Sequence, residues 1–275
     1  MAVRRPVLIA LAVSLLLPAG PAQAAQVSCL KCHPSHYRSL GGCVVCHRGD
    51  PRSDRVRIAH HDLVQGRYAW FALPGSEPVV RGRRLVEVFA CRRCHTSVGK
   101  GNRLASNLDR LPRGTTAQGI FAAIKTPALL MPQFHFDERQ GTDLVNAILA
   151  GERESGQKGA GMGQEAPQVV HFQSGEANRE NVFEKRCGAC HRLLTRACGR
   201  LGRGSIGPNL SGLLSEHYPK TAQSGAPWSP AALEKWLKNP RQSREQTQMR
   251  PVALQEGELE KLQVLFTDRP SPPGP

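Results

Sequence analysis

The chain has 275 residues, long enough for more than one domain, and only 5% of them are aromatic. After the first residues no stretch approaches the ~18 apolar residues of a membrane-spanning helix, so we expect no internal membrane span. The formal net charge of +15 predicts attraction to acidic protein surfaces or to anionic membrane headgroups, and a generally solvated basic face is an equally good explanation.

The first residues are typical of a secretory signal peptide. Arg4 and Arg5 precede an apolar run from Val7 to Leu17, and Ala22-Gln23-Ala24 carries the small residues that signal peptidase prefers. We therefore expect residues 1–24 to be cleaved near Ala24 and the mature chain to be periplasmic. An uncleaved signal that anchors the chain is the alternative. Because an exported protein meets no nucleic acid, we expect no nucleic-acid partner.

Four Cys-x-x-Cys-His pentads occupy Cys29–His33, Cys43–His47, Cys91–His95 and Cys187–His191. Two thiols one helical turn apart can bond the two vinyl groups of a haem while the imidazole that follows binds the iron. A zinc site or a redox dithiol is the alternative, but neither calls for a histidine directly after the second cysteine. The pattern predicts four covalently bound haem c groups. Their attachment points are Cys29, Cys32, Cys43, Cys46, Cys91, Cys94, Cys187 and Cys190, and their iron ligands are His33, His47, His95 and His191.

The uneven spacing of the pentads divides the chain. The first two lie so close together that the segment around them cannot bury an apolar core without its haems, and we expect little regular structure there. Each later pentad has room for a helical domain of its own. The predicted order is a dihaem segment over 25–63, a connector over 64–81, a domain over 82–150, a flexible linker over 151–174, a domain over 175–267 and a disordered tail over 268–275.

The connector and the two larger segments carry their own local signals. Tyr68, Trp70 and Phe71 in the connector predict packing against a haem edge or a domain seam. Both larger segments show helix patterns in the same order, which predicts a mainly α fold and a diverged internal duplication. The predicted helices are one over 84–89, one that begins at Thr115 or Thr116, one capped by Asp137, one through Val182 and Phe183, one begun by Ser229-Pro230, and one with Leu259, Leu262 and Leu265.

Residues 82–150 and 175–266 resemble class I cytochrome c domains. Gly82 with Phe89, and Gly175 with Phe183, stand where that family crosses its first and last helices. The resemblance implies a methionine on the far face of each iron. Met131 in Leu130-Met131-Pro132 and Met249 in Gln248-Met249-Arg250-Pro251 precede the last helices, as the family's axial methionine does.

Alternatives remain open for both methionines. Ordinary core packing is what a methionine usually does, and His135 competes with Met131 as a ligand. Residues 206–213, Ile-Gly-Pro-Asn-Leu-Ser-Gly-Leu, are similar to the family's loop in which a proline packs against the iron-binding histidine. In the first domain Ser106-Asn107-Leu108 is only a weak counterpart of that loop.

The dihaem segment contains no methionine, so histidines must take the far faces of its irons. His33-Pro34-Ser35-His36 resembles an arrangement in closely packed multihaem cytochromes, where the second histidine binds the neighbouring haem. This resemblance implies that His36 serves the haem of His47. His60 or His61 then remains for the haem of His33, with His60 slightly favoured.

These features predict a tetrahaem electron-transfer protein, in which bis-histidine haems of lower potential pass electrons to histidine/methionine haems. Its expected partners are other redox proteins with acidic docking surfaces, such as a quinol dehydrogenase or periplasmic and outer-membrane cytochromes. The alternatives are a haem enzyme, such as a peroxidase or oxyanion reductase with one open iron, and an obligate subunit of a larger complex. The whole-chain architecture resembles cytochromes of bacterial selenite and tellurite reduction systems. Cys198, outside the pentads, is expected to be inert.

Overall fold

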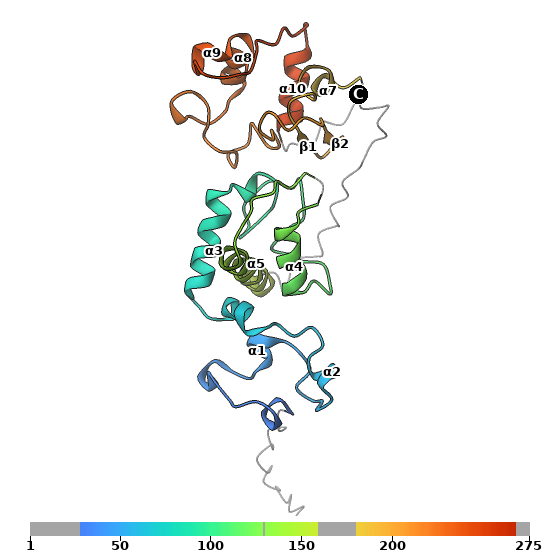
Figure 1. Cartoon of the computed structure of the whole chain (residues 1–275), viewed down its shortest axis with the longest axis vertical. Coiled ribbons are helices and arrows are strands. Elements are labelled where there is room, and N and C mark those ends of the chain that lie inside the picture. Colours follow the sequence, from blue (N-terminus) through green and yellow to red (C-terminus); the bar gives the residue numbers. More distant parts are fainter. Residues whose placement is uncertain (1–27, 129, 159–179, 268–275) are drawn as a thin grey trace, which may run out of the picture.

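The computed structural model describes residues 28–128, 130–158 and 180–267. The predicted signal peptide, most of the predicted linker with Gly175, and the tail lie outside the described residues. The described part is mostly helical, as the sequence predicts. Three regions follow one another along the long axis of the molecule in chain order (Figure 1).

The N-terminal region, residues 28–63, has only short elements. They are η1 (Ser28–Lys31), η2 (Arg38–Leu40), α1 (Val44–His47) and α2 (Val56–Ala59), and none of them contains a buried residue. Apolar side chains such as Leu30, Tyr37 and Val56 are half or more exposed. A soluble protein of ordinary composition buries many of its large apolar side chains, so this region lacks an apolar core of its own.

The predicted connector is an integral part of the middle region, residues 64–128 and 130–158. Its 3-10 helix η3 (Gly66–Ala72) buries Tyr68 and Phe71 in the apolar core. The Phe71 N–H donates to Asn146 Oδ1 at 2.9 Å, and Asn146 Nδ2 donates to the Arg67 carbonyl at 3.0 Å. Asn146 is fully buried, so its amide satisfies backbone groups that would otherwise lose their hydrogen bonds. The connector therefore packs as firmly as the helices that follow it.

The middle region is built on two long helices, α3 (Glu77–Val88) and α5 (Glu138–Lys158). They cross at Gly82, where an added Cβ would lie 2.0 Å from the Asp143 carbonyl oxygen. Only glycine allows this approach, and Gly82 is therefore the crossing residue that the sequence predicts. The shorter helix α4 (Ala117–Lys125) begins as expected, with the Thr116 hydroxyl accepting from the Gly119 N–H at 3.0 Å. The 3-10 turn η4 (Cys91–Arg93) opens the third pentad.

Helix α5 begins where predicted and ends later. Asp137 caps it by accepting from the Gln140 N–H at 2.7 Å. The expectation of a flexible linker from residue 151 is wrong for its first eight residues, because α5 continues to Lys158. Glu152 pairs with Arg48 at 3.1 Å, Glu154 pairs with Arg83, and Arg153 donates to the Ala72 carbonyl at 3.2 Å. These contacts hold charged side chains in place, whereas the composition of this segment predicted a flexible linker.

The C-terminal region, residues 180–267, packs helices around a second apolar core. Ser229 caps α8 (Pro230–Lys238) through a hydrogen bond from the Ala232 N–H at 3.1 Å, as predicted, and Phe183 meets Phe266 edge to face at 6.0 Å. A small antiparallel hairpin, which the sequence analysis missed, pairs the buried residues Leu193 and Leu201. The elements are α7 (Val182–Arg186), β1 (Leu193–Thr195), β2 (Gly199–Leu201), η5 (Gln223–Gly225), α8 (Pro230–Lys238), α9 (Pro240–Ser243) and α10 (Glu258–Phe266).

Candidate functional site

A cavity of about 720 Å³ lies inside the C-terminal region. Its lining includes the fourth pentad, through Cys187, Cys190 and His191, and it also includes Met249 from the loop before α10. The rest of the wall is largely apolar, with Trp228 and Trp236 among its residues. A mostly apolar cavity of this size with a few converging polar atoms is typical of a cofactor site. The folded chain thus brings the predicted ligand Met249 to the same cavity as the predicted ligand His191.

Met249 is fixed in this cavity from the α8 side. The Trp236 indole N–H donates to the Met249 sulfur at 2.9 Å. Three residues further on, the Val252 N–H donates to the Leu237 carbonyl at 2.9 Å and ties the loop to α8. Trp228 packs edge to face on Trp236 at 5.6 Å. Both the sulfur and its donor are therefore held by packed neighbours.

The histidines of three pentads make the same hydrogen bond. His191 Nδ1 lies 2.9 Å from the Pro208 carbonyl oxygen, His95 Nδ1 lies 2.8 Å from that of Ser106, and His47 Nδ1 lies 3.0 Å from that of Val64. A carbonyl oxygen can only accept, so Nδ1 carries the proton and Nε2 keeps its lone pair. Metal-binding histidines are usually oriented in this way, with the second ring nitrogen donating to a carbonyl or carboxylate.

Ser106-Asn107-Leu108 of the middle region, the weak sequence counterpart of the loop at residues 206–213, makes the same hydrogen bonds as that loop. The Leu108 N–H donates to the Thr96 carbonyl and the Leu210 N–H donates to the Arg192 carbonyl, both at 2.9 Å. The Asn107 side chain accepts from the Asp109 N–H, also at 2.9 Å, as Asn209 accepts from Ser211. Most of these hydrogen bonds are made by backbone groups, which leave little trace in the sequence. Because the middle region lacks the Gly-Pro pair, only the shared Asn-Leu pair indicated that the two loops are similar.

Burial changes the pKa of two pentad cysteines and of one pentad histidine. Burial raises the pKa of the Cys187 thiol to about 12 and that of Cys91 to about 11. It lowers the pKa of His95, against the opposing effect of the hydrogen bond to Ser106. At neutral pH the two thiols are protonated, which makes them poor nucleophiles, and the His95 imidazole is neutral, the form that binds a metal.

Met131 and His135 occupy the loop between α4 and α5. Met131 is half-buried, and its N–H donates to the Ala128 carbonyl at 3.3 Å. Among the described residues its sulfur has no hydrogen-bond donor comparable to Trp236, and the pairing of Met131 with His95 stays a prediction. His135 is exposed, with a backbone φ of 53°, in keeping with a surface residue.

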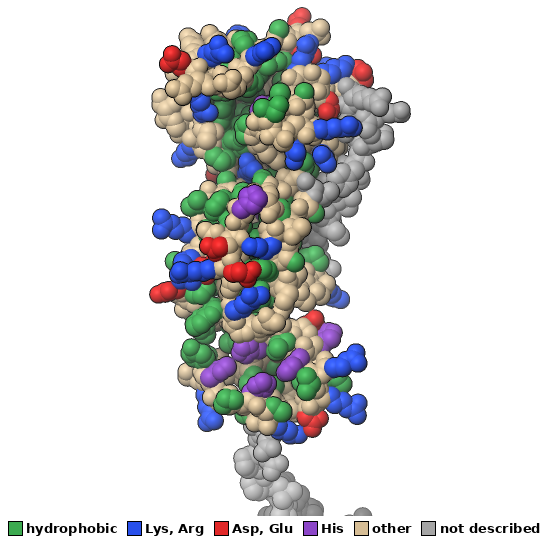
Figure 2. Space-filling model, in the orientation of Figure 1, with side chains coloured by type: hydrophobic (Ala, Val, Ile, Leu, Met, Phe, Trp, Pro, Cys, Tyr) green, Lys and Arg blue, Asp and Glu red, His purple; other side chains and the backbone are tan. Residues whose placement is uncertain are grey.

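The histidines of the N-terminal region gather in pairs, and their side chains are close together on the surface (Figure 2). His36 Nε2 lies 3.4 Å from His47 Nε2. The ring of His33 lies 6.1 Å from that of His60. His61 instead contacts the Asp62 carboxylate at 3.3 Å and lines a separate hollow. The geometry therefore matches the pairing of His36 with His47, and it favours His60 over His61 as the partner of His33.

A small hollow of about 150 Å³ adjoins the second pentad. Cys43, Cys46, His47 and His36 line it together with Trp70 from η3. Of the connector aromatics, Tyr68 and Phe71 thus pack into the core of the middle region, whereas Trp70 stands at the predicted attachment site. Tyr68 and Phe71 thus lie in the core of one region and not at a seam between domains, and the packing of Trp70 against a haem edge stays a prediction.

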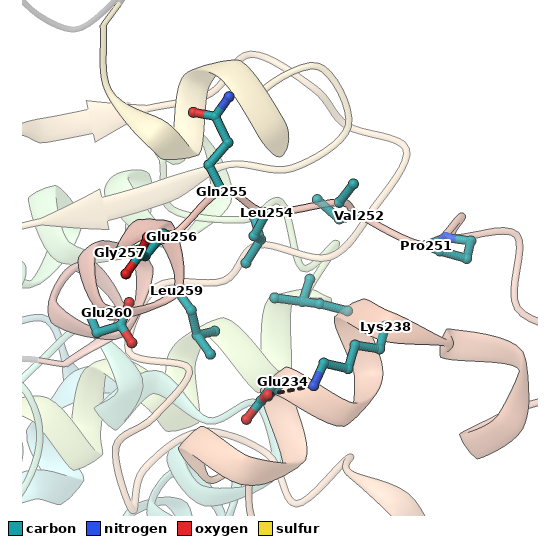
Figure 3. A pocket seen from close by; sticks show the side chains of 12 residues that line it. Glu234, Lys238, Pro251, Val252, Leu254, Gln255, Glu256, Gly257, Leu259 and Glu260 are labelled. Atoms are coloured by element: carbon teal, nitrogen blue, oxygen red, sulfur yellow. Dashed lines mark hydrogen bonds and ion pairs between the residues drawn. The ribbon is translucent and has the colours of Figure 1, made fainter.

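Two further features lie outside these sites. A groove of about 590 Å³ runs between α8, α10 and the loop at 251–257 (Figure 3). Its lining has neither cysteine nor histidine, and the ion pair between Glu234 and Lys238 at 2.7 Å borders it. Cys198 is half-buried, with its sulfur 3.9 Å from the Asn181 amide nitrogen.

Within the described ranges, no three His, Cys, Asp or Glu side chains cluster as they would around a metal ion. No helix of those ranges is both long and apolar enough to cross a membrane. Comparison of the chain with family models, curated proteins and solved structures found no match.

Proposed function

We propose that this chain is a periplasmic electron-transfer protein that binds four haem c groups covalently and performs no bond chemistry of its own. The observation that carries the proposal is the cavity of the C-terminal region, where Cys187, Cys190, His191 and Met249 share one lining. The donor set fits haem c: two thiols for thioether bonds, an imidazole and a thioether sulfur for the iron.

In this proposal the chain supplies attachment, ligands and an apolar wall. The Pro208 carbonyl holds His191 with Nε2 available as a ligand, and Trp236 holds the Met249 sulfur in the cavity. The iron of a bound haem would alternate between its ferric and ferrous states. The largely apolar part of the lining would favour the state of lower charge.

The N-terminal region supports the same function with a different ligand set. The pairs His36/His47 and His33/His60 supply imidazoles on both sides of two sites, and no methionine is available in that segment. Because thioether ligation favours the ferrous state, bis-histidine sites lie at lower potential than histidine/methionine sites. Electrons would then pass from the N-terminal region toward Met131 and Met249.

The fold agrees with the proposed class. The close helix crossing at Gly82 and the loops around Ser106 and Pro208 support the resemblance of the sequence over 82–150 and 175–266 to class I cytochrome c domains. Export to the periplasm rests on residues 1–24 of the sequence, and the net charge of +15 favours redox partners with acidic docking surfaces.

The direct test is the intact mass of the mature protein produced in a host with the cytochrome c maturation machinery. We expect four haem additions that survive denaturation. A Cys187→Ala/Cys190→Ala variant should carry three, whereas Cys198→Ala, the matched control outside the pentads, should carry four. A wild-type protein with fewer than four additions would contradict the proposal.

A further inference from the structure

The middle and C-terminal regions meet at a contact that we term the seam, formed by Arg93, Asn102 and Leu130 on one side and by Asn209, Gly212, Ser215 and Tyr218 on the other. Asn102 is 6% exposed, and its Nδ2 donates both to Ser215 Oγ at 2.8 Å and to the Arg93 carbonyl at 2.9 Å. Arg93 Nη1 lies 3.4 Å from the Asn209 carbonyl, and its guanidinium stacks over Tyr218 at 5.9 Å. Buried polar groups that satisfy each other across a contact fix its register.

Asn209 bridges two of the predicted haem sites. Its Oδ1 accepts from the Ser211 N–H and hydroxyl at 2.9 and 2.6 Å, so the orientation of its amide is determined. Its Nδ2 then points across the seam and donates to the Leu130 carbonyl at 3.2 Å. Leu130 directly precedes Met131, and Asn209 directly follows Pro208, whose carbonyl holds His191. One side chain thus joins the methionine loop of the middle region to the histidine loop of the C-terminal region.

The seam also requires a glycine. Gly212 has a φ of 68°, and an added Cβ would lie 2.4 Å from Asn102 Nδ2 and 2.8 Å from the Arg93 carbonyl oxygen. Any side chain at this position must push the two regions apart. The close approach is therefore built into the sequence on the C-terminal side.

We propose that Asn209 is a positioning residue for Met131: through the seam, the C-terminal region holds the methionine loop of the middle region in its ligating conformation. The proposal rests on the proposed function, since it concerns Met131 as an iron ligand. It adds that axial ligation in the middle region depends on a residue from the other domain.

Two variants break the seam in different ways. Asn209→Asp keeps the oxygen that accepts from Ser211, but it replaces the donor to Leu130 with a carboxylate oxygen that the carbonyl repels. Its control is Ser205→Asp, which places the same charge on an exposed residue of the same loop. Gly212→Ala inserts a Cβ into the seam. Its control is Gly257→Ala, where φ is 74° and nothing lies within 4 Å of the added Cβ.

The measurement is the rate at which imidazole displaces methionine from the ferric, haem-loaded full-length protein. We expect two kinetic phases, one for each methionine-ligated iron, and the Met131 phase is identified because Met131→Ala lacks it. Asn209→Asp and Gly212→Ala should accelerate the Met131 phase about tenfold, the effect of losing one partly buried hydrogen bond and leaving its acceptor unpaired. Ser205→Asp and Gly257→Ala should leave that phase unchanged.

Amide hydrogen exchange over residues 126–134 gives a second readout that needs no iron signal. Exchange there should be faster in Asn209→Asp than in Ser205→Asp. Unchanged exchange, an unchanged Met131 phase in Asn209→Asp, or acceleration of the Met249 phase alone would overturn the proposal. If the wild-type protein shows no methionine ligation at all, the proposed function fails on that point, and the exchange data still decide whether the seam holds the loop.

Discussion

At the scale of single residues, the hydrogen bond from Trp236 to the Met249 sulfur gives the sharpest prediction. An N–H donor withdraws electron density from the sulfur, weakens its donation to a ferric iron and so favours the ferrous state. Trp236→Phe should therefore lower the potential of the Met249-ligated haem by about 40 mV, which for one electron corresponds to a hydrogen bond of about 1 kcal/mol. Spectroelectrochemical titration of the haem-loaded protein measures this shift.

Trp228→Phe is the matched control. Trp228 lines the same cavity, but its indole N–H donates to Thr221 Oγ1 at 3.0 Å and not to the sulfur. Its loss should leave the potential within a few millivolts of wild type. Equal shifts in both variants would show that general packing around the cavity sets the potential, and not the hydrogen bond.

The N-terminal histidines allow an equally direct comparison of neighbours. The ring of His60 lies 6.1 Å from that of His33, whereas His61 pairs with Asp62. His60→Ala should leave one iron five-coordinate, so that the reduced protein binds one equivalent of carbon monoxide. His61→Ala should bind none. Carbon monoxide binding to the His61 variant alone would reverse the assignment.

At the scale of elements, the crossing of α3 and α5 depends on Gly82. An added methyl group would overlap the Asp143 carbonyl and approach Ala147 Cβ to 2.7 Å, so the helices must separate. Gly82→Ala should destabilise the protein by about 3 kcal/mol through overpacking. Urea unfolding followed by far-ultraviolet circular dichroism, with equal haem content in both proteins, measures the change.

Gly156→Ala serves as the control for that substitution. Gly156 lies in α5 with nothing within 4 Å of an added Cβ. Alanine there should stabilise the helix by up to about 1 kcal/mol, because glycine has the larger conformational entropy in the unfolded chain. A Gly82→Ala variant as stable as Gly156→Ala would mean that the helices do not cross at Gly82.

The sequence predicted the helices whose first residues carry a capping side chain. The caps at Thr116, Asp137 and Ser229 each need only a side-chain oxygen and an amide three residues on, and all three are confirmed. The extension of α5 past residue 150 was not predictable in this way. It is supported by contacts with Arg48 and Arg83, which are far away in the sequence.

At the scale of the whole molecule, the spacing of the pentads and the order of the loops were enough to predict Met249 as the partner of the fourth pentad. The structure brings Met249 to the cavity of that pentad. The seam was not predictable. Asn209 and Gly212 lie in the loop at residues 206–213, whose resemblance indicated only a role beside the iron-binding histidine, and Asn102 carries no comparable sequence signal. Their role in the seam arises only when the two regions pack against each other. The three regions follow one another in chain order along the molecule, which under the proposed function would place its four haem sites in the same order (Figure 1).

The central claim is that four haems are bound and that the chain supplies ligands for both faces of every iron. The most direct test is the absorption spectrum of the dithionite-reduced protein at neutral pH, before and after carbon monoxide is added. We predict the spectrum of haem c with a Soret band that carbon monoxide leaves unmoved, because a six-coordinate iron offers no vacancy. Stoichiometric carbon monoxide binding in the wild-type protein would reveal an open iron and favour a haem enzyme, and a protein without any Soret band would contradict the account altogether.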